Sequence, residues 1–222
     1  MMGFWKRLFS LFYSIYFNFR YLPIKEARKI PILISWDTMC RIKGKIIIQN
    51  SDIRFGMIHL GVAGGSYGKG RGLKNSLIVK EGAYLRFSGI CHIASGFSIN
   101  VEENAQLVIG KDFSANYNLT ISVETDIDIH DSVLIGWNCT IIDADGHDIL
   151  NKEKTIINKA SKIEIREHVW IASNVSILKG TYLAKDSVVG YGAVICDSFE
   201  EPSCVIVGVP GKVAKRDIEW KM

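Results

Sequence analysis

The 222-residue chain lacks the features that stabilise a secreted protein or carry a chain across a membrane. Its five cysteines are odd in number and include no Cys-x-x-Cys pair, which argues against a disulfide framework and a zinc knuckle. We therefore expect a reducing, cytosolic setting. The uncharged run between Arg7 and Arg20 would span about 18 Å as a helix, well short of the roughly 30 Å hydrocarbon core of a bilayer. No small-residue cleavage site follows before Pro23, so a signal peptide is not expected.

Two further absences narrow the class of protein. The net charge is only +4, and we expect no nucleic-acid partner. The glycine-rich piece 61–72, which holds Lys69 and Arg71, lacks the Gly-Lys-[Ser/Thr] ending of a phosphate-binding loop. A plain surface loop is therefore favoured there over a phosphate cradle. Only four prolines accompany 20 glycines, a balance that suits many tight backbone corners.

A ladder with a period of six is the main positive feature of the sequence. It places a branched aliphatic residue at Ile165, Ile171, Ile177, Leu183, Val189 and Ile195. Neither an amphipathic helix, with its period of 3.6, nor a hairpin strand, with its period of two, predicts this spacing. A six-residue step instead suits a solenoid in which three short strands and their corners close one coil. The fourth residue after each of the first five rungs is small or β-branched, as an inner corner requires: Val169, Val175, Thr181, Ser187 and Ala193.

Earlier segments follow the same step less regularly. The rungs there are Ile93, Ile99 and Ala105, then Ile109, Ala115 and Ile121, and after a slip of two Ile129, Ile135 and Ile141. Before them the apolar spacing is irregular but strand-like, as expected for distorted early coils. We predict an all-β solenoid domain over residues 41–207, preceded by a helical, basic segment over 1–40 and followed by a short cap and tail over 208–222.

The N-terminal segment interleaves aromatic and basic residues. Aromatic and aliphatic side chains recur at helical spacing through residues 1–22, and residues 1–31 carry six basic residues against the single acid Glu26. This pattern predicts an amphipathic helix with one broad apolar face. The helix could pack on its own domain or on a partner subunit. Alternatively it could lie at a membrane surface, because aromatic and basic residues together suit anionic headgroups.

A polar excursion interrupts the ladder at about residues 143–163. It opens with Asp143-Ala144-Asp145-Gly146-His147 and continues through lysine-containing sequence until the rungs resume at Ile165. Loops that depart from a regular scaffold often carry the functional site. We therefore expect the chemistry of the protein to lie at this excursion.

The ladder, the segment from Ala115 to Ile121, the Asp-Ala-Asp-Gly-His run and Val169-Trp170-Ile171 together resemble the hexapeptide-repeat acyltransferases, over about residues 109–216. The likeness is greatest to the maltose, galactoside and nodulation-type O-acetyltransferases and to relatives in capsule and lipopolysaccharide biosynthesis. The resemblance implies a left-handed parallel β-helix, a homotrimer, and acetyl-CoA bound between subunits. It implies acetyl-CoA as a co-substrate and no tightly bound cofactor.

Acetyl transfer from a thioester to a hydroxyl needs a base, oxyanion donors and a cleft for both substrates. His147 matches the family's catalytic histidine, and an imidazole suits the base because its pKa lies near neutrality. Asp143 or Asp145 could orient that imidazole. Asn116 matches an active-site asparagine of the sugar-acetylating members, although a structural asparagine ladder is an alternative. Glu124 and Trp137 are the candidates for binding the acceptor.

The resemblance also suggests a donor site. Trp170 matches the family's interface tryptophan, and simple core or trimer packing is its alternative. The remaining donor-site candidates are Gly136, Ala172, Ser173, Gly190, Lys212, Lys215 and Arg216. The amides of Ala172 and Ser173 could bind the pantetheine arm, and the three basic residues could meet the CoA phosphates. Cys196-Asp197 departs from the usual Thr-Lys and weakens this mapping. A γ-class carbonic anhydrase shares the fold, but no two histidines here have its five-residue spacing, so no metal is expected.

The sequence thus predicts an acetyl-CoA-dependent O-acetyltransferase that acts on a sugar hydroxyl of a bacterial surface polysaccharide, lipopolysaccharide or lipid-linked precursor. We expect it in the cytoplasm, with a peripheral position at the inner face of the plasma membrane as a further option. Two alternatives stay open at this point. One is acetylation of an amino sugar or small soluble acceptor, and the other is a non-catalytic trimeric scaffold.

Overall fold

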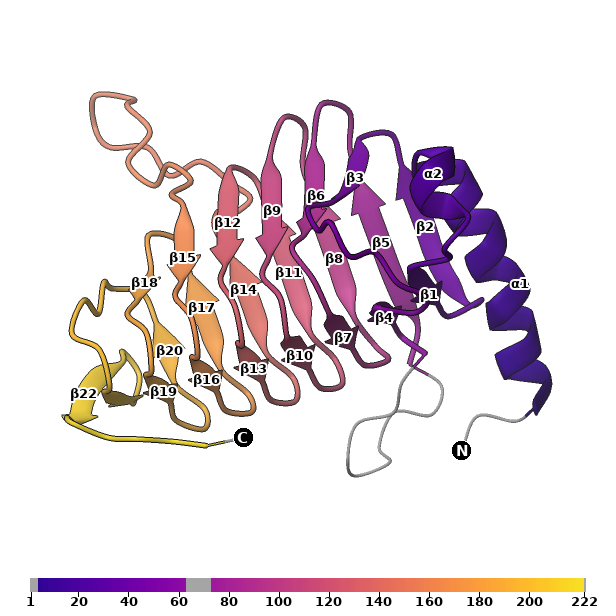
Figure 1. Ribbon diagram of the computed structural model, residues 1–222. Coiled ribbons are helices and arrows are strands. Elements are labelled where there is room, and N and C mark those ends of the chain that lie inside the picture. The colour runs from indigo at the N-terminus through magenta and orange to yellow at the C-terminus, as the bar shows by residue number, and fades with distance from the viewer. Residues whose placement is uncertain (1–3, 63–72, 222) are drawn as a thin grey trace.

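The computed structural model of the protein describes residues 4–62 and 73–221 (Figure 1). Most of the glycine-rich piece 61–72, including Lys69 and Arg71, lies outside the described residues. The chain begins with helix α1 (Phe4–Tyr21) and the short helix α2 (Ile24–Ala27), and then continues as short strands. No helix of the described part is both long enough and apolar enough to span a membrane.

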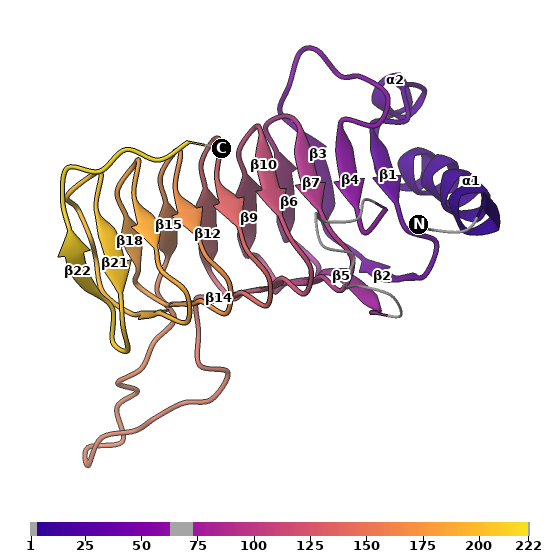
Figure 2. The same ribbon diagram turned by 90° about the horizontal axis from the view of Figure 1, so that it is seen from below.

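Three sheets form the three faces of one elongated solenoid (Figures 1 and 2). The first face contains β1 (Ile32–Ile34), β4 (Ile58–Leu60), β7 (Cys91–Ile93), β10 (Phe113–Ala115), β13 (Leu134–Ile135), β16 (Trp170–Ile171), β19 (Val188–Val189), β21 (Val205–Val207) and β22 (Lys212–Lys215). The second face contains β2 (Thr38–Ile42), β5 (Asn75–Val79), β8 (Ser98–Val101), β11 (Thr120–Val123), β14 (Thr140–Ile142), β17 (Ser176–Leu178) and β20 (Val194–Ile195). The third face contains β3 (Lys45–Ile48), β6 (Tyr84–Phe87), β9 (Gln106–Ile109), β12 (Asp126–Ile129), β15 (Ile163–Ile165) and β18 (Tyr182–Leu183).

The order of the strands confirms the predicted coil of three strands. Up to β20, each strand pairs in parallel with the strand three places further along the chain, and β19 then pairs in parallel with β21. Ile121 lies beside Ile141, which lies beside Ile177, and all three are fully buried. Stacked aliphatic files therefore fill the interior of the solenoid, as the six-residue ladder predicted. The first coil begins with β1 at Ile32, earlier than the predicted domain boundary at residue 41.

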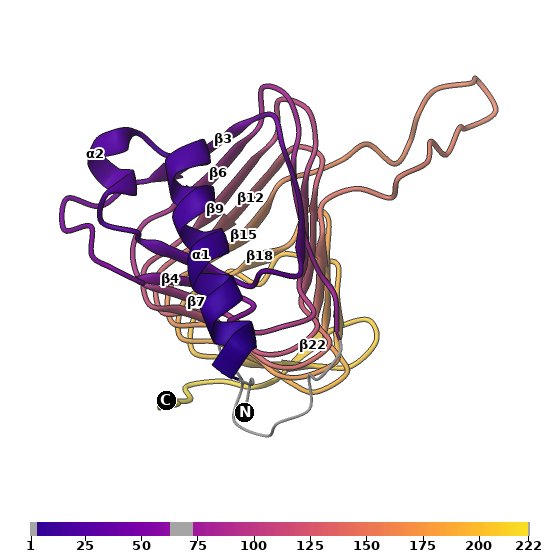
Figure 3. The ribbon, with the colours of Figure 1, turned by 90° about the vertical axis from the view of Figure 1, so that its right-hand side faces the viewer.

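Helix α1 covers the open edge of the first coil (Figure 3). Strand β1 pairs on one side with β4, and its other edge faces the helix. The Asn18 amide donates to the carbonyl of Ile32 at 2.7 Å and accepts from the Ile32 N–H at 3.1 Å. The hydroxyl of Ser14 accepts from the Ile34 N–H at 2.9 Å, and that of Ser10 accepts from the Trp36 N–H at 3.2 Å.

The spacing of these polar residues explains why they match the strand. Ser10, Ser14 and Asn18 lie four residues apart, a rise of about 6 Å along a helix. Alternate residues of a strand lie about 6.6 Å apart, so the three side chains meet the N–H groups of Trp36, Ile34 and Ile32 in turn. The predicted amphipathic helix is confirmed, but a buried polar stripe, and not its aromatic face, forms these bonds to the coil.

The C-terminal segment closes the other end of the solenoid. Strand β22 pairs antiparallel with β21, and the chain then runs back along the outside of the last coils (Figure 1). The indole N–H of Trp220 donates to the carbonyl of His168 at 3.0 Å. This arrangement agrees with the short capping segment predicted for the C-terminus.

Candidate functional site

The polar excursion leaves the solenoid after β14 at Ile142 and returns at β15, at Ile163. It projects well away from the coils as a long loop (Figures 1 and 3). Near its tip Leu150 and Ile156 form an antiparallel bridge, and the side chains of Ile149, Leu150, Ile156 and Ile157 are exposed. The predicted excursion over residues 143–163 therefore matches a loop whose apolar tip the single chain leaves uncovered.

Asp143 anchors the base of this loop. Its side chain is fully buried, and its carboxylate accepts from the backbone N–H groups of Glu124 at 2.7 Å and Thr125 at 2.8 Å. The hydroxyl of Thr125 donates to the same carboxylate at 2.8 Å. Ser161, where the loop returns to the solenoid, donates its N–H to the carbonyl of Asp143. These bonds satisfy a buried charge and tie both ends of the loop to the preceding coil.

Asp145 forms hydrogen bonds that hold the next part of the loop in place. Lys179 donates to its carboxylate at 2.5 Å, and Asn158 donates at 2.8 Å. The hydrogen bond from Lys179 is the main reason why the pKa of Asp145 lies below its ordinary value. The same Asn158 amide donates to the carbonyl of His147 at 2.8 Å and accepts from the N–H of Ile149. The backbone that carries His147 is therefore held from both sides of the loop.

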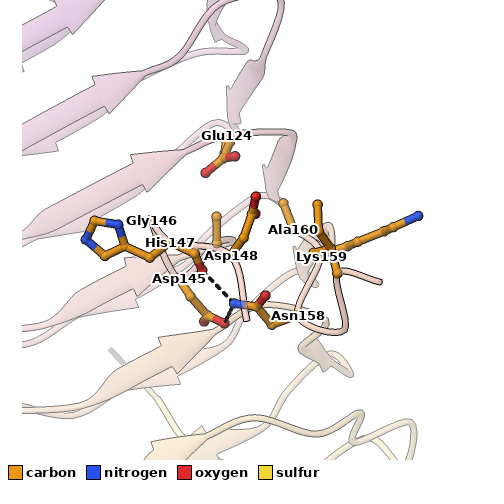
Figure 4. A pocket seen from close by; sticks show the side chains of 10 residues that line it. Glu124, Asp145, Gly146, His147, Asp148, Asn158, Lys159 and Ala160 are labelled. Atoms are coloured by element: carbon orange, nitrogen blue, oxygen red, sulfur yellow. Dashed lines mark hydrogen bonds between the residues drawn. The ribbon is translucent and has the colours of Figure 1, made fainter. Parts of the chain in front are cut away.

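His147 lies at an open cavity of about 450 Å³ at the base of the loop. The cavity is lined by charged and amide side chains together with small residues: Glu124, Ala144, Asp145, Gly146, His147, Asp148, Ile156, Asn158, Lys159 and Ala160. In Figure 4 the imidazole of His147 points away from Asp145 and Asn158, and it is exposed. Both acids predicted to orient it are bonded to other groups, Asp143 to backbone amides and Asp145 to Lys179 and Asn158. Asn158 and Lys179 were not predicted, because they lie 13 and 34 residues from the acid they hold.

Several predicted donor-site residues form a file along one corner of the solenoid. Asn116, Gly136, Ala172 and Gly190 directly follow β10, β13, β16 and β19, so they stack in successive coils. Each donates its backbone N–H to a carbonyl of the next coil, for example Ala172 to Val189 at 2.9 Å. The ladder therefore occupies the Ala172 N–H. Binding of the pantetheine arm by Ala172 or Ser173 stays a prediction.

Packing between coils explains the two glycines of this file. A Cβ atom on Gly136 would lie 2.7 Å from the backbone nitrogen of Ser173, and one on Gly190 would lie 2.6 Å from a methyl carbon of Val207. The hydroxyl of Ser173 accepts from the Trp137 N–H at 3.0 Å. Trp137 and Asn116 are partly buried and do not line the cavity at His147.

An asparagine ladder exists, but Asn116 is not one of its members. Asn118 donates to Asn138 at 3.1 Å, and Asn138 donates to Asn174 at 3.0 Å. All three residues have positive φ angles near 60°, the left-handed conformation that asparagine tolerates at a sharp corner. The side chain of Asn116 instead lies 3.4 Å from the carbonyl of Ile135.

The C-terminal segment contacts the predicted donor tryptophan. Trp170 is 38% exposed on the outer surface of β16, and its ring lies 5.9 Å from that of Trp220. Trp220 stacks on His168 at 4.1 Å, and His168 is bonded to Asp186 at 2.9 Å. His168 is thus packed between Trp220 and Asp186.

The predicted phosphate-binding residues lie on or beside β22. Lys212, Lys215 and Arg216 are exposed, and Arg216 pairs with Glu201 at 2.9 Å. None of the three lines the cavity at His147. Within residues 4–62 and 73–221, no group of three or more metal-ligating side chains comes together.

The fold is similar to that of solved hexapeptide-repeat acetyltransferases. The solved structure of the polysialic-acid-specific acetyltransferase NeuO has a TM-score of 0.61 at 21% sequence identity, and the match covers 86% of this chain and 79% of that one. This likeness is one of fold, and it confirms the predicted left-handed parallel β-helix with an N-terminal helix and a C-terminal cap.

Sequence comparison finds named relatives, each over only part of the chain. The galactoside O-acetyltransferase of Escherichia coli K12 is 35% identical over 108 residues, 48% of this chain and 52% of that protein. The polysialic acid O-acetyltransferase of Escherichia coli O1:K1 is 34% identical over 97 residues, 40% of this chain and 31% of that protein. The chain spans about half the length of the curated relatives that head this comparison. No protein-family model matches it. Over the matched residues, the chain is thus similar in sequence to O-acetyltransferases.

Proposed function

We propose that the protein is an acetyl-CoA-dependent O-acetyltransferase that acts on a sugar hydroxyl of a bacterial surface polysaccharide, lipopolysaccharide or lipid-linked precursor. The observation that carries the proposal is the exposed imidazole of His147 beside a polar cavity, on a backbone held by Asn158. Similarity to O-acetyltransferases of a galactoside and of a polysaccharide supports both the reaction and the class of acceptor.

His147 would act as the general base. Its imidazole removes the proton of the acceptor hydroxyl while the hydroxyl oxygen attacks the thioester carbonyl of acetyl-CoA. The tetrahedral intermediate then collapses, the carbon–sulfur bond breaks, and the proton passes from the imidazolium to the CoA sulfur. Glu124 lies in the wall of the same cavity and would bind the hydroxyl groups of the acceptor. Bound acetyl-CoA supplies the activated acyl group, and no other cofactor is needed.

A homotrimer would complete the site. The imidazole of His147 is exposed in the single chain, and the projecting loop carries Ile149 and Ile157 at 54% and 61% exposure. Exposed branched side chains on a long loop favour a neighbouring subunit as their cover. In such a trimer, Trp170 and the file from Gly136 to Gly190 would line a donor groove shared with the neighbour, and Lys212, Lys215 and Arg216 would meet the CoA phosphates.

The cellular position follows from the acceptor. A lipid-linked precursor would bring its sugar to the inner face of the plasma membrane, so we propose a cytoplasmic enzyme that contacts this surface through residues 1–22. The absence of a spanning helix in the described residues is compatible with such a peripheral contact.

The test is release of CoA thiol from acetyl-CoA with a panel of sugar acceptors. We expect His147→Ala to lower kcat by about 10²–10⁴-fold, the range typical of a lost general base. His130→Gln is the matched control, because His130 forms a surface contact with Glu164 at 3.3 Å, away from the cavity. The proposal fails if the wild-type protein releases no thiol with any acceptor and is not stabilised by CoA. Release with amino sugars alone would instead identify N-acetylation.

A further inference from the structure

Helix α1 presents its aromatic face to the outside. Ser10, Ser14, Phe17 and Asn18 are buried against the coil, and the opposite side of the helix is exposed. Among the α1 side chains that the structure describes, from Arg7 onward, the exposed apolar ones are Phe9, Leu11, Phe12, Tyr16 and Phe19. Most of them are more than half exposed. We call Phe9, Phe12, Tyr16 and Phe19 the outer face of α1. An amphipathic helix normally turns its apolar side to the core, so this helix has the reverse orientation.

The outer face extends onto neighbouring parts of the same end of the solenoid. Trp36 is 46% exposed, and its ring lies 6.2 Å from that of Phe9. Ile24 at the start of α2 is 64% exposed. Figure 3 views this end of the molecule directly and shows α1 lying across it. Exposed aromatic side chains gathered at one end of a protein mark an interaction site.

Charge identifies the partner. Arg7, Arg20, Lys25, Arg28 and Lys29 are exposed in and just after α1, and Glu26 is the single acid among residues 1–31. Two such surfaces from separate copies would bring like charges together. An 18-residue helix is also only about 27 Å long and offers far less than the roughly 800 Å² per partner of a stable protein interface. Aromatic side chains beside basic ones instead fit the headgroup region of an anionic bilayer.

We propose that the outer face of α1 inserts into the surface of an anionic membrane and holds the solenoid upright on it. The helix lies across the end of the solenoid, so insertion of its outer face directs the stacked coils away from the lipid (Figure 3). Successive coils rise by about 4.8 Å. Four steps separate β2 from β14, where the His147 loop begins, which places the site about 19 Å above the first coil. The helix itself adds about 10 Å.

This orientation has a consequence for the acceptor, which rests on the proposed function. A site roughly 30 Å above the lipid cannot reach a sugar attached directly to a membrane anchor. It would instead modify a saccharide several residues long, at a sugar distant from the lipid. The membrane contact itself does not depend on the reaction.

Vesicle sedimentation tests the contact. We expect the full-length protein to pellet with vesicles that contain phosphatidylglycerol and much less with phosphatidylcholine alone. The double variant Phe12→Glu/Phe19→Glu should pellet at least about tenfold less, because it places charge in the inserted face. Tyr191→Glu is the matched control, because Tyr191 is 75% exposed in the turn between β19 and β20 and should leave pelleting unchanged. Thermal unfolding of the double variant shows whether it folds.

Equal pelleting of the double variant and the wild type would overturn the proposal. A change in its oligomeric state with no change in pelleting would also overturn it, and would assign the face to a second copy of the chain. Acetyl transfer to a soluble saccharide should be unchanged in the double variant. Loss of pelleting with intact transfer supports the membrane contact, whereas a wild type that pellets without any transfer would contradict only the proposed reaction.

Energy transfer to labelled lipid headgroups tests the upright orientation. Cys196 is exposed just after β20, six coils from β2, and would lie roughly 40 Å from the lipid. Met39, on β2, lies in the first coil and is 46% exposed. A label on Met39→Cys in a Cys196→Ser background should transfer far more energy than a label on Cys196. Burial raises the pKa of the Cys40 thiol, which slows its labelling. Equal transfer would mean that the solenoid lies flat.

Discussion

At the scale of single residues, the structure gives Asp143 a structural role, which a substitution can distinguish from a catalytic role. Its carboxylate accepts three hydrogen bonds from Glu124 and Thr125 at the point where the loop departs. Asp143→Asn would remove the charge and replace one acceptor oxygen by a donor. We expect a loss of about 2 kcal/mol of stability and a Tm lower by roughly 4–8 °C, measured by calorimetry.

The matched control for Asp143→Asn is Asp148→Asn, an exposed position in the lining of the same cavity. That variant should keep the wild-type Tm. If Asp143→Asn also kept its Tm and lost only kcat, the carboxylate would be orienting the imidazole, as the sequence first suggested, and the anchoring role would be contradicted.

His59 gives the protein a pH-dependent stability. Burial, together with the nearby His92, lowers the pKa of His59 below its ordinary value of 6.5. The unfolded chain therefore binds the proton more readily than the folded chain, and stability falls as the pH drops below about 6.5. The Tm of the wild type should fall more between pH 7 and pH 5 than that of His59→Gln. Parallel curves for the two proteins would exclude this contribution.

Some residues of the candidate site can be predicted from the sequence, and others cannot. His147 could be found because the Asp-Ala-Asp-Gly-His run stands where the ladder breaks and matches a family motif. Its support by Asn158 and Lys179 could not, since the loop must fold back before these side chains meet. The role of His147 in the reaction stays a prediction until the thiol assay is done.

At the scale of elements, α1 acts as a substitute strand. Its Asn18 amide donates to and accepts from Ile32 of β1, as a neighbouring strand would. Asn18→Leu keeps a similar side-chain volume but leaves two buried backbone groups without partners. We expect a loss of about 2–4 kcal/mol and faster hydrogen exchange at the Ile32 amide, measured by mass spectrometry or NMR.

The control for Asn18→Leu lies on the other side of the same helix. Phe12→Ser should change stability by less than about 0.5 kcal/mol, because Phe12 is exposed and makes no bond to β1. A larger loss for Phe12→Ser than for Asn18→Leu would mean that the aromatic side, and not the polar stripe, holds α1 to the coil.

The helical period of residues 1–22 was sufficient to predict α1, but not the side on which it packs. Sequence patterns assign apolar residues to the interior, since that is the usual rule for helices on a core. The open backbone edge of β1 reverses the rule here, because its N–H and C=O groups need polar partners. Nothing in the spacing of Ser10, Ser14 and Asn18 reveals that a strand edge lies opposite.

At the scale of the whole molecule, the ladder predicted the solenoid because one interior must be filled coil by coil. Its irregularities have a physical cause. In β11 and β12 two residues of each strand point inward, Ile121 with Val123 and Ile127 with Ile129. The later strands β16, β19 and β20 have two residues and one inward side chain each. Longer strands lengthen the coil, so a long unbroken run of six-residue steps appears only near the C-terminal end.

The two ends of the solenoid also influence how copies of this protein can associate with each other. A parallel coil with bare ends would be a template on which further copies could add end to end and grow into fibres. Here a helix occupies one terminal edge, and at the other end a short reversed strand carries Lys212 and Lys215. On the first face, addition of a further copy is therefore opposed at both outer edges, by the helix beside β1 and by the lysines of β22.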